Sequence, residues 1–114
     1  MSRCLLLALL LLAGCGQGPA ADLQYIKQAR TLAAEWALLN EQARAGRVTE
    51  TYTRSMHYWL TDGLRTAQSS LTQPDSPYGH EMKSLLAEPT DTAPAALRAH
   101  AEALKQIEGE LESA

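Results

Sequence analysis

The side chains of this sequence best suited to binding a metal ion are three histidines and two methionines: His57, His80, His100, Met56 and Met82. Imidazole and thioether groups together suit soft or borderline metals such as copper. Their spacing matches no metal motif, because no two histidines are one helical turn apart and residues two apart do not share a helix face. A metal or small-ligand carrier that uses His57, His80 and His100 is therefore kept as an alternative, and no residue is assigned as a metal ligand.

The usual catalytic signatures do not occur in the sequence. It has no Gly-x-Ser-x-Gly elbow, no phosphate-binding glycine loop and no His-Glu-x-x-His motif. Glycoside hydrolysis needs two carboxylates that converge in a cleft. The candidate acids fall mostly on the expected outer faces of helices: Glu35, Glu41, Glu50 and Asp62. We therefore expect that the protein is not an enzyme and has no catalytic residue.

Three aromatic residues are candidates for contacting a partner: Tyr58, Trp59 and Tyr78. Aromatic side chains outside a helical seam are typical of binding hot spots. Tyr78 belongs to the longest irregular segment, residues 73–80, and loops displayed by a rigid scaffold often carry recognition. The alternative is that Tyr58 and Tyr78 fill the ends of a helical bundle.

The N-terminus has the parts of an export signal. Arg3 and the free amino group are positively charged, and Leu5–Leu12 form an apolar run too short to span a bilayer of about 30 Å. Two small residues, Ala13 and Gly14, then precede Cys15. Cys4 would be removed with the signal, which leaves Cys15 as the only thiol of an exported chain and without a partner for a disulfide.

The stretch Leu12-Ala13-Gly14-Cys15 resembles the lipobox of bacterial lipoproteins. This resemblance implies cleavage after Gly14 and attachment of a diacylglyceryl group and an acyl chain to Cys15, and several chains anchor a protein stably in a bilayer. It divides the chain into a signal peptide (1–14), a lipidated tether (15–21) and a mature domain (22–114). Gly16 stands where an aspartate favours inner-membrane retention, so the resemblance implies the outer membrane, facing the periplasm, of a Gram-negative cell.

Two other interpretations of the N-terminus remain open. The segment could be an ordinary secretory signal with cleavage elsewhere, or an uncleaved signal anchor. Either one would leave Cys15 without a lipid.

Composition favours helices. The chain has 114 residues and a net charge of −3, and it has no Lys/Arg cluster that would indicate nucleic-acid binding. Ala, Leu, Glu and Gln are abundant, whereas Val48 is the only valine and there are only two isoleucines. The sequence therefore predicts helix rather than strand.

Apolar periodicity and stop signals predict three long helices and one short one. We expect a first helix from the N-cap Asp22 to about Ala45 and a second from the N-cap Thr49 to about Leu71, with Trp36 and Trp59 in their seam. A short helix is expected at 79–87 and a last one at 92–111. The connection between the first two is short, so the fold class is an all-α, antiparallel helical bundle.

Taken together, these patterns predict an envelope lipoprotein, held by Cys15, whose non-catalytic helical domain contacts a protein or a cell-wall partner. A metal or small-ligand carrier and a self-associating structural lipoprotein remain the alternatives.

Overall fold

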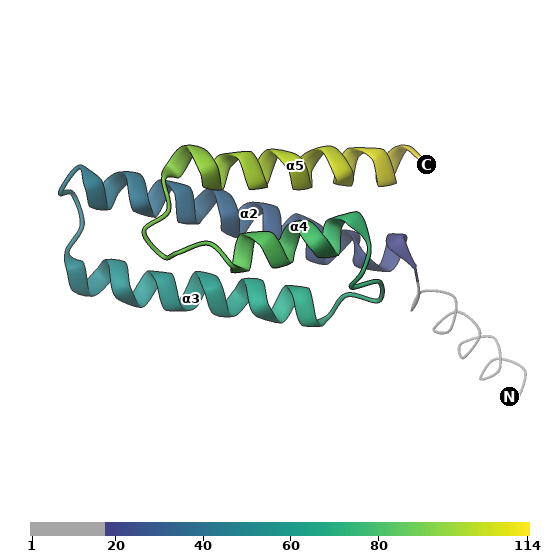
Figure 1. Ribbon diagram of the computed structural model, residues 1–114, viewed down its shortest axis with the longest axis horizontal. Coiled ribbons are helices and arrows are strands. Elements are labelled where there is room, and N and C mark those ends of the chain that lie inside the picture. Colours follow the sequence, from purple (N-terminus) through teal and green to yellow (C-terminus); the bar gives the residue numbers. More distant parts are fainter. Residues whose placement is uncertain (1–17) are drawn as a thin grey trace, which may run out of the picture.

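The computed structural model describes residues 18–114, and these form four helices. They are α2 (Pro19–Arg44), α3 (Glu50–Ser69), α4 (Pro77–Leu86) and α5 (Pro94–Ser113). Successive helices run in opposite directions, and α2 is flanked by α3 and α5 (Figure 1). The prediction of an all-α fold with three long helices and one short one is confirmed. Cys15 and Gly14 lie outside the described residues.

The chain turns between α2 and α3 at one end of the bundle, while α2 begins and α5 ends at the other (Figure 1). Gly46 makes this turn with a φ of 70°, a conformation that side chains with a Cβ rarely adopt. Thr49 then caps α3, because its hydroxyl accepts a hydrogen bond from the backbone N–H of Tyr52 at 3.1 Å, as the sequence predicted.

The start of α2 differs from the prediction. The helix begins at Pro19, in the N1 position where the missing N–H costs little, so that residues 19–21 belong to the helix and not to an extended tether. Asp22 is therefore not an N-cap. It lies inside the first turn with a fully buried side chain.

The short helix α4 packs on the other three and closes the core. It begins at Pro77, two residues earlier than expected, because Ser76 caps it by accepting a hydrogen bond from the Gly79 N–H at 3.1 Å. Met82 and Leu85 of α4 are fully buried, together with Trp36 of α2 and Leu97 of α5. The described core residues come from the four helices and the loop after α3, so residues 18–114 bury an apolar core of their own.

Two polar clamps attach the loops on either side of α4 to α2. Asp22 accepts three hydrogen bonds from Thr72 and Gln73 in the loop between α3 and α4, and a fourth from Tyr78 in the first turn of α4. At the other clamp, the indole N–H of Trp36 and the amide of Asn40 donate to the carbonyl of Thr90, both at 2.9 Å. Burying these groups costs little because each has a partner.

Candidate interaction surface

Four large apolar side chains are exposed on the described part of the molecule, and all belong to α2 and α3. Leu38 is 53% exposed, Tyr52 51%, and Tyr58 and Trp59 66% each. Single exposed apolar residues are normal, whereas a group of them marks a candidate interaction site. Tyr58 and Trp59 are therefore on the surface, and their role as contact residues stays a prediction.

A hollow of about 220 Å³ lies between α2 and α3 near the turn that joins them. We call it the aromatic groove and define it by its lining residues: Glu35, Leu38, Leu39, Gln42, Val48, Tyr52 and Met56. Tyr52, Met56 and Trp59 follow each other at spacings of four and three residues, which places Trp59 on the flank of α3 that lines the groove. Apolar side chains of two helices thus form a concave surface.

Trp59 does not lie in the seam between α2 and α3, where the sequence also predicted it. Leu60, the next residue in the chain, is buried there instead, at 3% exposure. Trp59 instead meets Tyr58 edge to face, with 6.1 Å between ring centroids. Such pairs contribute about 0.5–1.5 kcal/mol beyond their buried area, so the two rings hold each other in place on the surface.

Tyr78 is not on the surface. The sequence leaves two roles open for it, contact with a partner and filling of the bundle, and its burial favours the second. Its side chain is 3% exposed, and its hydroxyl donates a hydrogen bond to the Asp22 carboxylate at 2.7 Å. Burial and this carboxylate both raise the pKa of Tyr78 above its ordinary value. Because α4 starts at Pro77, Tyr78 belongs to the first turn of a packed helix rather than to a display loop.

His57 belongs to the clamp on the loop between α4 and α5. Its Nε2 lies 2.7 Å from Oδ1 of Asn40, whose amide nitrogen donates to the carbonyls of Thr90 and Thr92. The Asn40 oxygen is thus the acceptor, and Nε2 of His57 carries the hydrogen. Burial lowers the pKa of His57 below its ordinary value, and the charge of Asp91 only partly opposes this.

The other two histidines have different surroundings. Nδ1 of His100 lies 2.7 Å from Glu81, and its Nε2 lies 3.5 Å from Glu88. His80 is exposed in the first turn of α4. Nowhere in residues 18–114 do three His, Cys, Asp or Glu side chains come close enough to hold a metal ion. The fold thus does not gather His57, His80 and His100 into one site.

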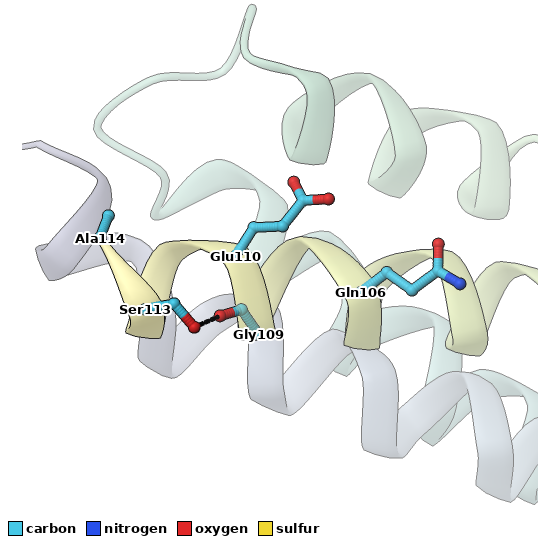
Figure 2. A pocket seen from close by; sticks show the side chains of 5 residues that line it. All are labelled: Gln106, Gly109, Glu110, Ser113 and Ala114. Atoms are coloured by element: carbon cyan, nitrogen blue, oxygen red, sulfur yellow. Dashed lines mark hydrogen bonds between the residues drawn. The ribbon is translucent and has the colours of Figure 1, made fainter.

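Another hollow, of about 630 Å³, lies at the end of α5, but it is not enclosed by other elements. Its lining comes only from the last turns of this helix: Gln106, Gly109, Glu110, Ser113 and Ala114 (Figure 2). A surface formed by one helix offers few converging groups to a small ligand.

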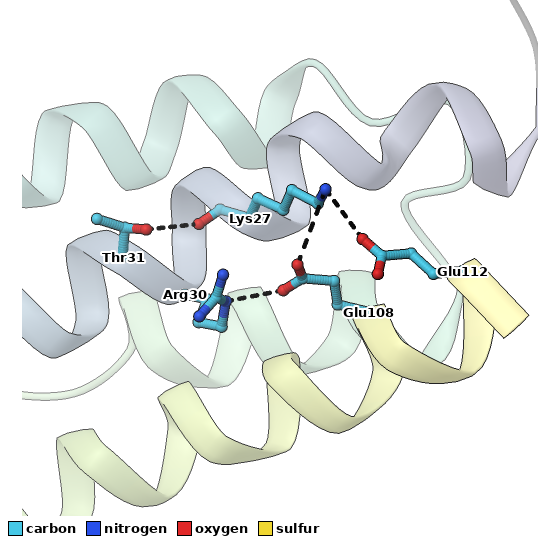
Figure 3. Close-up of polar contacts among 5 residues, drawn as sticks. All are labelled: Lys27, Arg30, Thr31, Glu108 and Glu112. Carbon is cyan, nitrogen blue, oxygen red and sulfur yellow. Dashed lines mark hydrogen bonds and ion pairs between the residues drawn. The ribbon is translucent and has the colours of Figure 1, made fainter.

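A cluster of charged side chains joins the N-terminal half of α2 to the last turns of α5 (Figure 3). Nε of Arg30 lies 2.7 Å from Glu108, and Nζ of Lys27 lies 2.9 Å from Glu112. The Glu112 carboxylate raises the pKa of Lys27 above its ordinary value. These charges pair with each other between the two helices, which is the arrangement of a helix–helix contact rather than of a binding site.

Leu38 and the exposed half of Tyr52 are parts of the surface that the sequence analysis missed. Tyr52 follows the apolar stripe of α3, a spacing that by itself favours a place in the seam. Leu38 lies beside Leu39 but outside the apolar stripe of α2. An apolar residue outside the stripe is expected on the surface, and this is the signal by which Leu38 could have been found.

No protein-family model, curated protein or solved structure matched the chain in our comparisons. In the described residues, none of the helices has the length and apolar character needed to cross a bilayer.

Proposed function

We propose that this protein is an envelope lipoprotein, held in a membrane by lipid on Cys15, whose non-catalytic helical domain binds a partner protein through the aromatic groove. The observation that carries the proposal is the exposure of Leu38 and Tyr52, which line one concave surface, together with exposed Trp59 on the same helix as Tyr52. Tyrosine and tryptophan are enriched in protein interfaces and among their hot spots.

The position of the groove along α2 fits this role. Four residue steps separate Cys15 from Pro19, so their Cα atoms are at most about 15 Å apart in any conformation. Leu38 lies about 28 Å farther along the helix. The groove lies near the turn between α2 and α3, and this turn is at the opposite end of the bundle from the start of α2 (Figure 1). A lipid on Cys15 would therefore leave the groove at the end that can point away from the membrane.

The anchor is tested by metabolic labelling of the full chain with radioactive palmitate, followed by flotation of membranes. The unaltered chain is expected to carry label and to float with the membranes. The Cys15→Ala chain is expected to lose both. Cys4→Ala is the matched control, since Cys4 lies in the segment that the lipobox resemblance assigns to the signal peptide, and it should keep both. Recovery of an unlabelled Cys15→Ala chain in the membrane fraction would reject the lipid anchor.

A further inference from the structure

The two sides of the seam between α2 and α3 are covered differently. On one side, His57 and Asn40 hold the loop between α4 and α5 against the helices. The other side is the aromatic groove, on the flank of α3 that carries Met56, and no other helix of residues 18–114 lines it. The described fold therefore completes one side of this seam and leaves the other open.

The shape of the open side fits the side chains of another helix. Leu39, Met56 and Val48 are partly or fully buried at its base, while Leu38 and Tyr52 are half exposed at its edges. Ridges of side chains on one helix pack into grooves of this kind on another. An amphipathic helix laid in an apolar groove is also a common mode of peptide recognition. A flat bilayer surface would not fill a concave site.

The charge of the groove indicates which charge the bound helix should carry. Glu35 is the one acidic or basic side chain that lines the groove, and within residues 18–114 it has no ion-pair partner. A lysine or arginine beside the apolar stripe of the bound helix would pair with this carboxylate. An acidic residue in the same place would be repelled.

The protein's own N-terminus does not reach this groove once the signal has been removed. Cys15 lies within about 15 Å of Pro19. Glu35, the lining residue nearest in sequence, lies about 24 Å from Pro19 along α2. The residues that remain after cleavage are thus too few, and the occupant must come from another molecule.

We infer that the aromatic groove binds an amphipathic helix of a second protein, with apolar side chains between α2 and α3 and a basic side chain beside Glu35. This inference rests on the proposed function, because it names the partner class of the same surface. It predicts that binding of such a helix depends both on its apolar stripe and on the sign of the charge that it places beside Glu35.

The test titrates helical peptides of about 18 residues, about five turns, into residues 18–114 in a calorimeter. The first peptide has a leucine stripe flanked by lysines. The second has glutamate in place of each lysine. The third has the same residues as the first in a scrambled order, so that its leucines do not form a stripe. The first peptide is expected to bind one to one, and the other two at least about tenfold more weakly, which is about 1.4 kcal/mol.

Two substitutions and their matched controls locate the binding. Leu38→Asp should weaken the lysine peptide at least about tenfold, since it puts a charge into the apolar contact. Glu35→Gln should weaken it about two- to fivefold, the range of an exposed ion pair. Ala99→Asp and Glu110→Gln alter exposed positions of α5 and should leave the Kd unchanged. Circular dichroism of each variant checks that the helices persist.

Other results would overturn the inference. These are no binding of the lysine peptide, equal binding of all three peptides, or no effect of Leu38→Asp. Light scattering that shows a dimer dissociated by Leu38→Asp would assign the groove to a second copy of the chain, and vesicle binding lost in that variant would assign it to a membrane. Because these titrations need no lipid, their failure is distinct from failure of the Cys15 labelling.

Discussion

At the scale of single residues, Asp22 is the side chain on which the most polar contacts converge. It is fully buried in the first turn of α2, and it accepts hydrogen bonds from Thr72, Gln73 and Tyr78 at 2.7–3.2 Å. Burial alone would raise its pKa, but these hydrogen bonds outweigh burial and lower the pKa of Asp22 below its ordinary value of 3.8. The ionised carboxylate therefore joins two segments that are 50 residues apart in sequence.

Replacing this carboxylate tests its role. We expect Asp22→Asn to lower the free energy of unfolding by about 2–3 kcal/mol, because the amide cannot accept from all the buried donors. The measurement is urea denaturation of residues 18–114. Asp75→Asn is the control, since the Asp75 side chain is 91% exposed, and its effect should stay within about 0.5 kcal/mol. Equal effects of the two substitutions would contradict the clamp.

His57 gives the fold a dependence on pH. Its pKa is lowered by burial in the folded state, so the unfolded chain binds a proton more readily. The contribution of His57 to the free energy of unfolding is therefore fully present above pH 6.5, its ordinary pKa. It is lost as the pH falls through the lowered pKa of the folded state. Asp22 adds a second loss of stability below pH 3.8.

This effect appears in thermal melts between pH 7.5 and about pH 5. The Tm of residues 18–114 should fall across this interval, and the fall should be smaller in His57→Gln. His80→Gln is the matched control, because His80 is exposed, and it should keep the original slope. A slope unchanged by His57→Gln would show that other groups cause it.

At the scale of elements, the loop before α4 depends on a glycine. A Cβ on Gly79 would lie 2.1 Å from the carbonyl oxygen of Pro74, a backbone atom that cannot rotate away. A Cβ on Gly109 in α5 would have no neighbour within 4 Å. The same substitution therefore has opposite consequences in the two helices.

Alanine in place of glycine normally stabilises a helix by about 1 kcal/mol. In Gly79→Ala the contact with Pro74 is expected to outweigh this gain and to lower the free energy of unfolding by more than about 1 kcal/mol. Gly109→Ala should instead stabilise the fold by up to about 1 kcal/mol. Chemical denaturation of both variants measures the difference. Two stabilised variants would mean that the loop at Pro74 moves aside without cost.

The number and approximate positions of the helices could be predicted from the sequence because apolar spacing and caps such as Thr49 act locally. The start of α2 could not, because Asp22 has the chemistry of an N-cap and only the distant loop at Thr72 decides otherwise. The burial of Tyr78 depends on the same contact. Trp59 and Leu60 both fit the stripe of α3, and the packing of α3 on α2 decides between them.

At the scale of the whole molecule, α2 is the central helix, because it contacts α3, α4 and α5. The short connections in the sequence predicted antiparallel packing. They did not predict which side of the seam between α2 and α3 would remain uncovered. That depends on where the short helix α4 and its loops lie, which apolar periodicity does not determine. The aromatic groove is thus a property of the assembled bundle, although Tyr58 and Trp59 could be proposed from their residue types.

The clamp at Asp22 also has a mechanical consequence. In a chain tethered through Cys15, any pull between membrane and partner would enter the domain at Pro19, one helical turn before Asp22. The four hydrogen bonds that Asp22 accepts, three from the loop at Thr72 and one from Tyr78 of α4, would then bear load together. The buried carboxylate would thus resist the separation of the first turn of α2 from the bundle under tension.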